Sequence, residues 1–198
     1  MIKQRILSSI EVKQAILSDN SLLDRIEQAA KLITDCFKDG NKVFFCGNGG
    51  SAADAQHLAA EFSGRFYLDR LALPAEALHC NTSYLTAIAN DYNFDIIYSR
   101  LIEGMAKKGD VLVGLSTSGN AKNVVFAFEK ALDMGIYTIG LTGETGGLMK
   151  DISNILLNVP SIDTPRIQES HILIGHIICE FVENCLFASK SLDTCKMT

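Results

Sequence analysis

The chain lacks several features that mark membrane, secreted and disordered proteins. It has only 3 prolines and 15 glycines in 198 residues, and 47% of its residues are hydrophobic, which excludes a disordered or collagen-like chain. No apolar run approaches the roughly 18 residues that a bilayer span needs, and the N-terminus lacks the apolar segment of a signal peptide. The six cysteines form no CxxC pair and no secreted-scaffold spacing, which indicates reduced thiols. We therefore expect a cytoplasmic protein without a membrane partner.

The charge balance of the chain argues against one class of ligand, nucleic acid. The chain carries 18 Lys and Arg against 23 Asp and Glu, a net charge of −5, and it has no block of basic residues. Such a chain is poorly suited to follow a phosphate backbone, so we expect no nucleic acid partner. A length near 200 residues can bury a core without a structural metal, and any metal would therefore be functional.

What the sequence does contain is an alternation of helical patterns and short apolar runs. Two amphipathic helices are predicted over residues 2–17 and 21–37. The apolar runs that follow are each bounded by turn residues and predict strands at residues 42–46, 75–79, 111–115, 136–141 and 154–159. This order predicts one α/β domain over residues 1–198, built around a parallel sheet of about five strands.

The last predicted helix, over residues 165–188, is apolar on nearly every face, so either the core or another subunit must bury it. The mean hydropathy of +0.17 is high for a chain without a membrane span, and apolar faces hidden between subunits would account for it. We therefore expect an oligomer, with residues 1–38 as its N-terminal oligomerisation helices. Residues 189–198 form a short polar tail that we expect to be frayed.

Three predicted strands end in loops rich in glycine and hydroxyl side chains, at residues 47–51, 116–120 and 142–147. The carboxyl ends of parallel strands meet at one edge of the sheet, where open α/β sheets bind ligands. Glycine lets main-chain N–H groups converge, and the helix that follows presents its positive end, so each loop can cradle an anion. One such loop is a common turn, but three at one edge favour a ligand site.

The first loop also satisfies a dinucleotide-binding fingerprint, Gly47-x-Gly49-x-x-Ala52. That fingerprint needs an acidic residue about 20 positions on, at the end of the second strand. Asp69 stands near that distance but precedes the strand, which ends in uncharged residues at 78–81, and no P-loop Gly-Lys-Ser/Thr follows any loop. We therefore expect a small phosphorylated ligand and no nucleotide cofactor.

The helix that begins at the first loop carries Asp54, His57 and Glu61 at positions i, i+3 and i+7, which lie on one face. His57 and Glu61, one turn apart, are spaced to chelate a divalent metal, with Asp54 orienting the imidazole. Spacing alone favours the alternative, an ordinary surface ion pair at i, i+4 that contributes little. The position of this helix at an anion cradle favours the site.

The last predicted helix carries polar residues in an apolar surround, among them Gln168, Glu169, His171 and His176. A buried histidine must be hydrogen-bonded or ligated, and a backbone carbonyl is its more frequent partner. On a helical wheel His176 lies about 20° from Glu169 and about 80° from Gln168, so the wheel pairs His176 with Glu169. Periodicity does not say which of Gln168 and Glu169 faces a site.

Together these segments resemble the phosphoheptose isomerases of the sugar-isomerase (SIS) family over essentially the whole chain. One departure is Ala121, where members often carry a substrate-contacting serine, so one contact is expected to be missing or replaced. The resemblance implies a three-layer α/β sandwich with flavodoxin-like winding and a homotetramer with sites at subunit interfaces. The matching segments are residues 46–57, Glu61, residues 64–65, 90–91, 116–120 and 166–169, and His176.

The resemblance implies an aldose–ketose isomerase that converts sedoheptulose 7-phosphate to D-glycero-D-manno-heptose 7-phosphate through an enediol. This is the first step of ADP-heptose biosynthesis for bacterial surface polysaccharide, and the sequence leaves open whether the product feeds lipopolysaccharide, capsule or protein glycosylation. The resemblance also implies one zinc ion per subunit, held by His57, Glu61, Gln168 and His176. It therefore selects Gln168 as the ligand, whereas the helical wheel pairs His176 with Glu169. We expect Glu61 and His176 to exchange the protons. The positions that match substrate contacts are Asn48, Gly49, Gly50, Ser51, Glu61, Asn90, Asp91, Ser116, Thr117, Ser118 and Gln168.

A second function from a different class stays open. One relative of these isomerases is a non-catalytic regulator of replication initiation with a similar glycine loop. That relative lacks residues equivalent to Glu61 and His176, whereas this chain has both, which favours catalysis.

Overall fold

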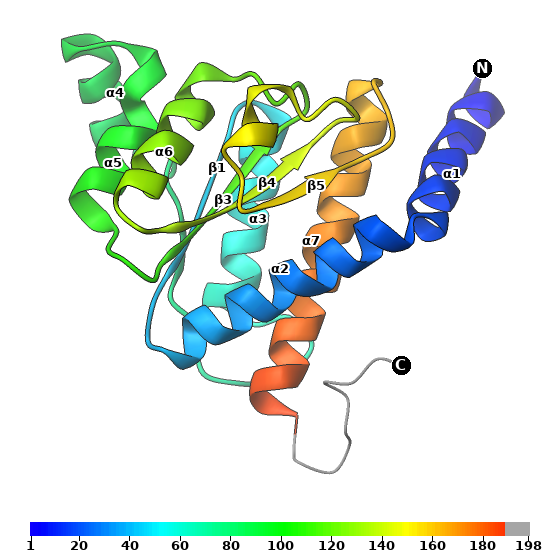
Figure 1. The fold of residues 1–198 in the computed structure, drawn as a ribbon, viewed down its shortest axis with the longest axis horizontal. Helices are drawn as coiled ribbons and strands as arrows, with labels where there is room; N and C mark the ends of the chain where they lie inside the picture. Colours follow the sequence, from blue (N-terminus) through cyan, green and yellow to red (C-terminus); the bar gives the residue numbers. More distant parts are fainter. Residues whose placement is uncertain (189–198) are drawn as a thin grey trace.

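The structure is a computed structural model in which residues 1–188 are described, so the predicted tail at 189–198 lies outside the described residues. A sheet of five parallel strands forms the middle layer, in the order β2-β1-β3-β4-β5 (Figure 1). This order is the flavodoxin-like winding, so the expected fold class is confirmed. The strands are β1 (Val43–Gly47), β2 (Ala75–Ala77), β3 (Val111–Ser116), β4 (Tyr137–Thr142) and β5 (Ile155–Asn158).

Helices cover both faces of this sheet and complete three layers (Figure 1). Helices α2, α3 and α7 pack on one face, and α4, α5 and α6 pack on the other. The two predicted N-terminal helices and the long last helix are all present. The helices are α1 (Ile2–Ser18), α2 (Asn20–Lys38), α3 (Gly50–Ser63), α4 (Thr82–Asp91), α5 (Ile97–Met105), α6 (Lys122–Asp133) and α7 (Thr164–Phe187), with short 3-10 turns η1 (Phe94–Ile96) and η2 (Gly147–Asp151).

Strand β1 shows why the strands of this sheet are uninterrupted apolar runs in the sequence. Val43 and Phe45 point into the core beneath α2, α3 and α7, whereas Phe44 and Cys46 point into the core beneath α4, α5 and α6. Because side chains of a strand alternate between faces and both faces are covered, every residue of the strand is buried. Burying each of these phenylalanines contributes about 2 to 3 kcal/mol.

The sheet order also decides where a ligand can bind. Strands β1 and β3 are hydrogen-bonded neighbours, but α3, which follows β1, packs on one face and α6, which follows β3, packs on the other. The chain therefore leaves the two strand ends in opposite directions, which makes this point the topological switch point of the sheet. In open α/β sheets this switch point is the place where ligands bind.

Helix α7 is the one helix within residues 1–188 that is long and apolar enough to cross a membrane. The same composition is typical of a core helix, and α7 packs against both α2 and α3 in the body of the protein (Figure 1). Its apolar residues Ile174, Ile178 and Val182 belong to the buried core. The length and the high hydropathy of α7 are thus explained by its burial between α2, α3 and the sheet.

His171 of α7 is completely buried, and its Nε2 donates a hydrogen bond to the carbonyl oxygen of Thr142 at 3.1 Å. This is the backbone partner that the sequence predicts for a core histidine. Burial lowers the pKa of His171 to about 4, although the hydrogen bond to Thr142 opposes the shift. His171 is therefore neutral in the folded protein at physiological pH.

We predict that His171 makes stability depend on pH. Because its folded-state pKa of about 4 lies below the ordinary value of 6.5, the unfolded chain binds this proton first as the pH falls. The stabilisation is complete above about pH 6.5 and is lost toward pH 4, by about 3 kcal/mol. Urea unfolding across this range measures the loss. The variant His171→Gln keeps a donor but does not titrate there, so it should flatten the curve, and equal curves for the two proteins would contradict the assignment.

Candidate active site

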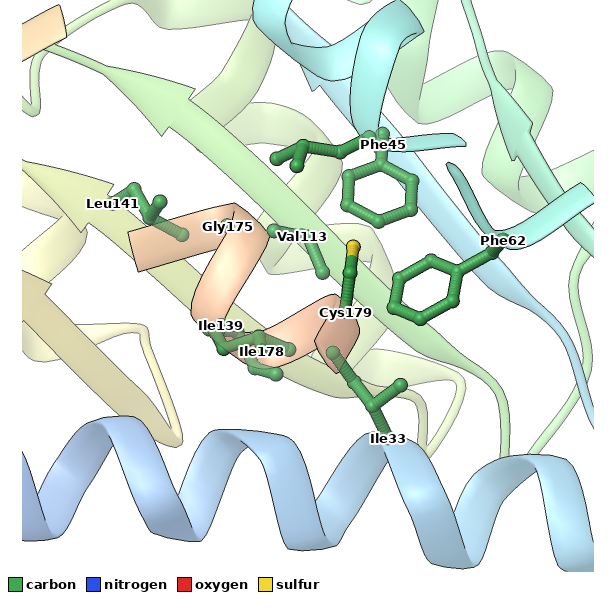
Figure 2. A pocket seen from close by; sticks show the side chains of 10 residues that line it. Ile33, Phe45, Phe62, Val113, Ile139, Leu141, Gly175, Ile178 and Cys179 are labelled. Atoms are coloured by element: carbon green, nitrogen blue, oxygen red, sulfur yellow. The ribbon is translucent and has the colours of Figure 1, made fainter. Parts of the chain in front are cut away.

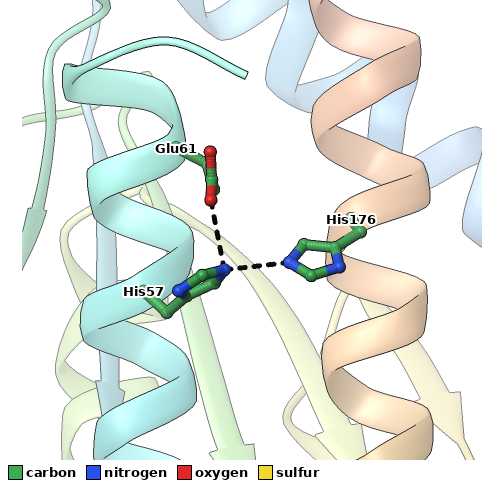
Figure 3. A group of neighbouring side chains, drawn as sticks. All are labelled: His57, Glu61 and His176. Atoms are coloured by element: carbon green, nitrogen blue, oxygen red, sulfur yellow. Dashed lines mark hydrogen bonds and ion pairs between the residues drawn. The ribbon is translucent and has the colours of Figure 1, made fainter. Parts of the chain in front are cut away.

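Helices α3 and α7 lie side by side and bring three potential ligand side chains together (Figure 3). His57 Nε2 lies 3.1 Å from Glu61 Oε1 and 2.9 Å from His176 Nε2. His57 and Glu61 share a face of α3 because they are one turn apart, and His176 reaches them from α7. We call these three residues the His–Glu cluster, and their donor atoms all lie within 4.8 Å of one another.

The donor set of the His–Glu cluster fits a divalent metal ion. Two imidazole nitrogens and a carboxylate oxygen are ligands that zinc prefers, and three protein ligands leave a coordination position open, as in catalytic zinc sites. The cluster is also accessible, because the side chain of His57 is 50% exposed and that of Glu61 is 21% exposed. The Nε2 atoms of His57 and His176 face each other at 2.9 Å, and imidazole nitrogens that converge in this way are able to bind one metal ion.

The close approach of α3 to α7 depends on Gly175, the residue before His176. A Cβ at Gly175 would lie 2.5 Å from Leu58 Cδ2, so any larger residue there would force the buried Leu58 side chain to move. Gly175 also lines a small apolar void of about 10 Å³ between α2, α3, α7 and the sheet (Figure 2). A void of this size holds at most one water molecule and belongs to the core. Residues around it include Ile33, Phe45, Phe62, Cys179 and Ile178.

Asp54 lies one turn before His57 on α3, and its Oδ2 is buried without a hydrogen-bond partner among residues 1–188. Burial raises the pKa of this carboxyl, and the nearby His57 and His176 act in the opposite direction. Within residues 1–188, the two imidazoles therefore affect Asp54 through their charge, and Oδ2 forms no hydrogen bond to either ring. The predicted role of Asp54 in orienting His57 stays a prediction.

The helical-wheel pairing of His176 with Glu169 is wrong. Glu169 points toward α1, where its Oε2 accepts a hydrogen bond from Ser9 Oγ at 2.7 Å and lies 3.7 Å from Lys13 Nζ. Its Oε1 accepts a hydrogen bond from Arg166 at 2.5 Å. A wheel ignores where a long side chain bends, and the two cations draw the Glu169 carboxylate away from the cluster.

Gln168 instead lies against the start of α3. A Cβ placed on Gly50 would be only 2.6 Å from Gln168 Nε2, so glycine at this position makes room for the amide. Gln168 therefore borders the first glycine loop, which is one of the predicted substrate segments. Its predicted service as a metal ligand stays a prediction.

The loops after β3 and β4 meet at the carboxyl edge of the sheet. The N–H of Gly143 donates to the carbonyl oxygen of Thr117 at 3.0 Å, and Gly119 adopts a positive φ of +67° beside the backbone of Gly146. The loops border a cleft of about 270 Å³. Hydroxyl and amide side chains around it include Thr117, Ser118, Asn120, Thr145 and Thr164.

The first loop is braced by an amide pair that no sequence motif indicates. Asn48 and Asn123 exchange two hydrogen bonds of 2.8 Å, each amide nitrogen donating to the other amide oxygen. Asn123 stands in the first turn of α6 and is buried, 75 positions from Asn48. No local pattern signals this pairing, because only the β1–β3 neighbourhood brings the two loops together. Ser51, a predicted substrate contact, is 3% exposed.

The predicted contacts Asn90 and Asp91 lie elsewhere. They are exposed at the end of α4, and Asn90 Nδ2 donates to Asp91 Oδ1 at 2.9 Å. Helix α4 lies on the opposite face of the sheet from α3 and α7 (Figure 1). In residues 1–188 of one chain neither side chain hydrogen-bonds to the glycine loops or to the His–Glu cluster. Ala121, the departure from the family pattern, is the N-cap of α6 and offers no side-chain oxygen to that helix.

Comparison with known proteins agrees with this fold and site. A model of the SIS domain matches residues 9–143. The phosphoheptose isomerase of Clostridium acetobutylicum is 52% identical over 189 residues, which are 96% of this chain and 96% of the relative. That of Citrifermentans bemidjiense is 54% identical over 186 residues, 94% of this chain and 96% of the relative.

A solved structure of phosphoheptose isomerase from Neisseria gonorrhoeae has a TM-score of 0.85 and 42% identity, covering 93% of this chain and 100% of that chain. The structure from Francisella tularensis has a TM-score of 0.87 at 36% identity, with 92% and 96% covered. The chain therefore belongs to the SIS-domain family. Within that family it falls among the phosphoheptose isomerases.

Proposed function

We propose that this protein is an aldose–ketose isomerase that converts sedoheptulose 7-phosphate to D-glycero-D-manno-heptose 7-phosphate. The observation that carries the proposal is the convergence of Glu61 and His176, from two distant helices, in one accessible cluster. Roughly half of all residues are shared with phosphoheptose isomerases along nearly the full chain, which supports the choice of a seven-carbon substrate.

The reaction moves a carbonyl from C2 to C1. A base takes a proton from C1 and O2 gains a proton, which gives an enediol. A proton is then returned at C2 while O1 loses one, and the oxygens carry negative charge as these protons move. Glu61 supplies a carboxylate and His176 an imidazole, which are the groups that most often transfer protons in enzymes. Their meeting in one cluster allows both to reach one substrate carbon pair.

The glycine and hydroxyl loops hold the distant phosphate and so fix the reacting carbons. In the proposal, Asn48, Gly49 and Gly50 supply contacts from the first loop, and residues 116–118 supply hydroxyls from the second. The cleft beside Thr117 and Ser118 supports this assignment. Further proposed contacts are Ser51, Asn90, Asp91 and Gln168.

We propose that His57, Glu61, Gln168 and His176 hold one zinc ion per subunit. When bound, zinc supplies positive charge that stabilises the developing oxyanion. Glu61 would then have two roles, because its carboxylate would bind the metal and would also exchange a proton with the substrate. The convergence of His57, Glu61 and His176 supports the metal assignment.

We further propose a cytoplasmic homotetramer, with sites at subunit interfaces, that feeds ADP-heptose and lipopolysaccharide biosynthesis and contacts neither nucleic acid nor membrane. Helix α1 supports the oligomer, because it extends from the body with Ile2 76%, Ile6 57% and Ile10 44% exposed (Figure 1). An apolar face of this kind is costly to leave in water. A partner subunit would also give Asn90 and Asp91 access to a site that they do not reach within one chain.

The test is an isomerase assay over a panel of pentose, hexose, amino-sugar and heptose phosphates, with and without a chelator. We expect turnover of sedoheptulose 7-phosphate, a fall of at least about 100-fold after metal removal, and recovery with zinc. Activity that survives complete metal removal would contradict the zinc proposal. Absence of turnover on every sugar phosphate, together with capture of a replication initiator protein, would favour the non-catalytic regulator.

A further inference from the structure

A buried ion pair joins α7 to the segment that follows α3, outside the His–Glu cluster. Arg70 Nε donates to Glu183 Oε1 at 2.9 Å, and both side chains are only 2% exposed. Glu183 stands on α7 seven residues after His176, and therefore on the same face of that helix. Neither residue belongs to the proposed catalytic, substrate or metal set.

Arg70 holds the end of α3, the helix that carries His57 and Glu61. Its Nη2 donates to the carbonyl oxygen of Glu61 at 2.8 Å, and its Nη1 donates to that of Phe62 at 2.8 Å. The last carbonyls of a helix have no partner within the helix, and a guanidinium placed there satisfies them. Because one of these carbonyls belongs to Glu61, Arg70 contacts the backbone of a cluster residue directly.

Glu183 holds the segment that follows α3. Its carboxylate accepts hydrogen bonds from the backbone N–H groups of Phe66 at 3.1 Å, Tyr67 at 2.7 Å and Leu68 at 2.8 Å. Burial alone would raise the pKa of Glu183, but these three donors and Arg70 lower it below its ordinary value. The carboxylate is therefore charged at neutral pH.

The segment that Glu183 binds, residues 66–68, also contacts the His–Glu cluster. The ring of Phe66 lies 5.6 Å from the ring of His176, centroid to centroid, with an interplanar angle of 35°. Glu183 thus restrains His176 in two ways, through the helix that both share and through the Phe66 ring packed on the imidazole. Arg70 restrains Glu61 through its carbonyl, and the ion pair joins the two sets of contacts.

We propose that Arg70 and Glu183 are positioning residues that fix the spacing of α3 and α7 and so hold Glu61 and His176 at working distance. The inference rests on the proposed function of the His–Glu cluster. Buried ion pairs contribute little net stability compared with apolar residues of similar volume. Catalytic groups, in contrast, need their geometry fixed to a fraction of an ångström, which a pair with hydrogen bonds to both helices provides.

The test compares Arg70→Lys and Glu183→Gln with a control, Asp110→Asn. Arg70→Lys keeps the charge but loses the planar fork that reaches both α3 carbonyls. Asp110 is a matched buried carboxylate, because its oxygens accept from the backbone N–H groups of Lys42 at 2.9 Å and Lys107 at 2.8 Å. It lies at the amino end of the sheet, so its loss should cost stability without disturbing the cluster.

The primary measurement is the NMR spectrum of the imidazole rings in the metal-free protein, which has 4 histidines. We expect Arg70→Lys and Glu183→Gln to shift the resonances of His57 and His176, and Asp110→Asn to leave them unchanged. Zinc affinity, measured by chelator competition, should fall by about 10- to 100-fold in the first two variants. In the isomerase assay kcat should fall with KM within about threefold of the wild-type value.

Unshifted imidazole resonances in folded Arg70→Lys would overturn the proposal, as would shifts of the same size in Asp110→Asn at a matched loss of stability. If Glu183→Gln does not fold, the Arg70→Lys comparison decides alone. Wild-type protein that lacks isomerase activity while Arg70→Lys still shifts the two imidazoles would refute the proposed function and leave the positioning role standing.

Discussion

Glu61→Gln is expected to lower kcat for the sugar-phosphate isomerisation by at least about 10³-fold, because an amide has the shape of the carboxylate but takes up no proton. His176→Gln is expected to be as severe, since it removes the second proton-transfer group. The fold and the binding of substrate should change little, because the phosphate loops lie outside both substitutions. Steady-state kinetics, calorimetric titration with substrate and circular dichroism separate these effects.

Glu169→Gln is the matched control for this experiment. Glu169 is a carboxylate on the same helix as His176, but it hydrogen-bonds to Ser9 and Arg166 beside α1. Its loss should leave kcat within about threefold of the wild-type value. Substantial activity in Glu61→Gln would remove Glu61 from the mechanism. A collapse in Glu169→Gln would show that a carboxylate outside the His–Glu cluster is equally needed, which would contradict the special role of Glu61.

Gly119→Ala is expected to destabilise the protein by about 2 to 4 kcal/mol and to weaken substrate binding. Gly119 has φ +67°, and a Cβ there would lie 2.0 Å from the carbonyl oxygen of Gly146. The obstacle is backbone, so the loops after β3 and β4 would have to separate. Those loops form the cleft that contains Thr117 and Ser118, which links the stability loss to the site. Urea unfolding and substrate titration measure the two effects.

Gly40→Ala separates the cost of backbone conformation from the cost of the loop contact. Gly40 has φ +73°, but nothing lies within 4 Å of a Cβ at that position. This variant should therefore lose only about 1 kcal/mol, the ordinary cost of placing alanine in the left-handed region. Equal losses of unfolding free energy in Gly119→Ala and Gly40→Ala would show that the loops after β3 and β4 separate without cost. That result would contradict the close packing of Gly119 against Gly146.

Most of the fold was predictable from local pattern. The apolar run at residues 42–46 became β1 with a shift of one residue, and the helical period at residues 165–188 became α7. Strands of a parallel sheet are buried on both faces, so they appear as continuous apolar runs that are easy to recognise. The predicted run at residues 75–79 shortened to β2 at Ala75–Ala77, an edge strand that pairs only with β1.

Two of the three residues of the His–Glu cluster were predictable in the same way. His57 and Glu61 lie one turn apart, so a sequence with helical period is enough to place them on one face. His176 stands 119 positions from His57, and only the family resemblance, not any local pattern, predicts that the two meet. The choice between Gln168 and Glu169 shows the limit of the wheel, because it depends on Lys13 of one helix and Gly50 of another.

The sequence by itself determined the period of each segment and hence the helices, the strands and the polar face of α3. Only the tertiary structure decided which distant residues meet: Asn48 with Asn123, Arg70 with Glu183, and His57 with His176. The physical reason is that hydrogen bonding within a helix and side-chain alternation along a strand act over a few residues. Contacts between segments depend instead on how the layers pack, and small residues such as Gly175 decide how closely two helices approach.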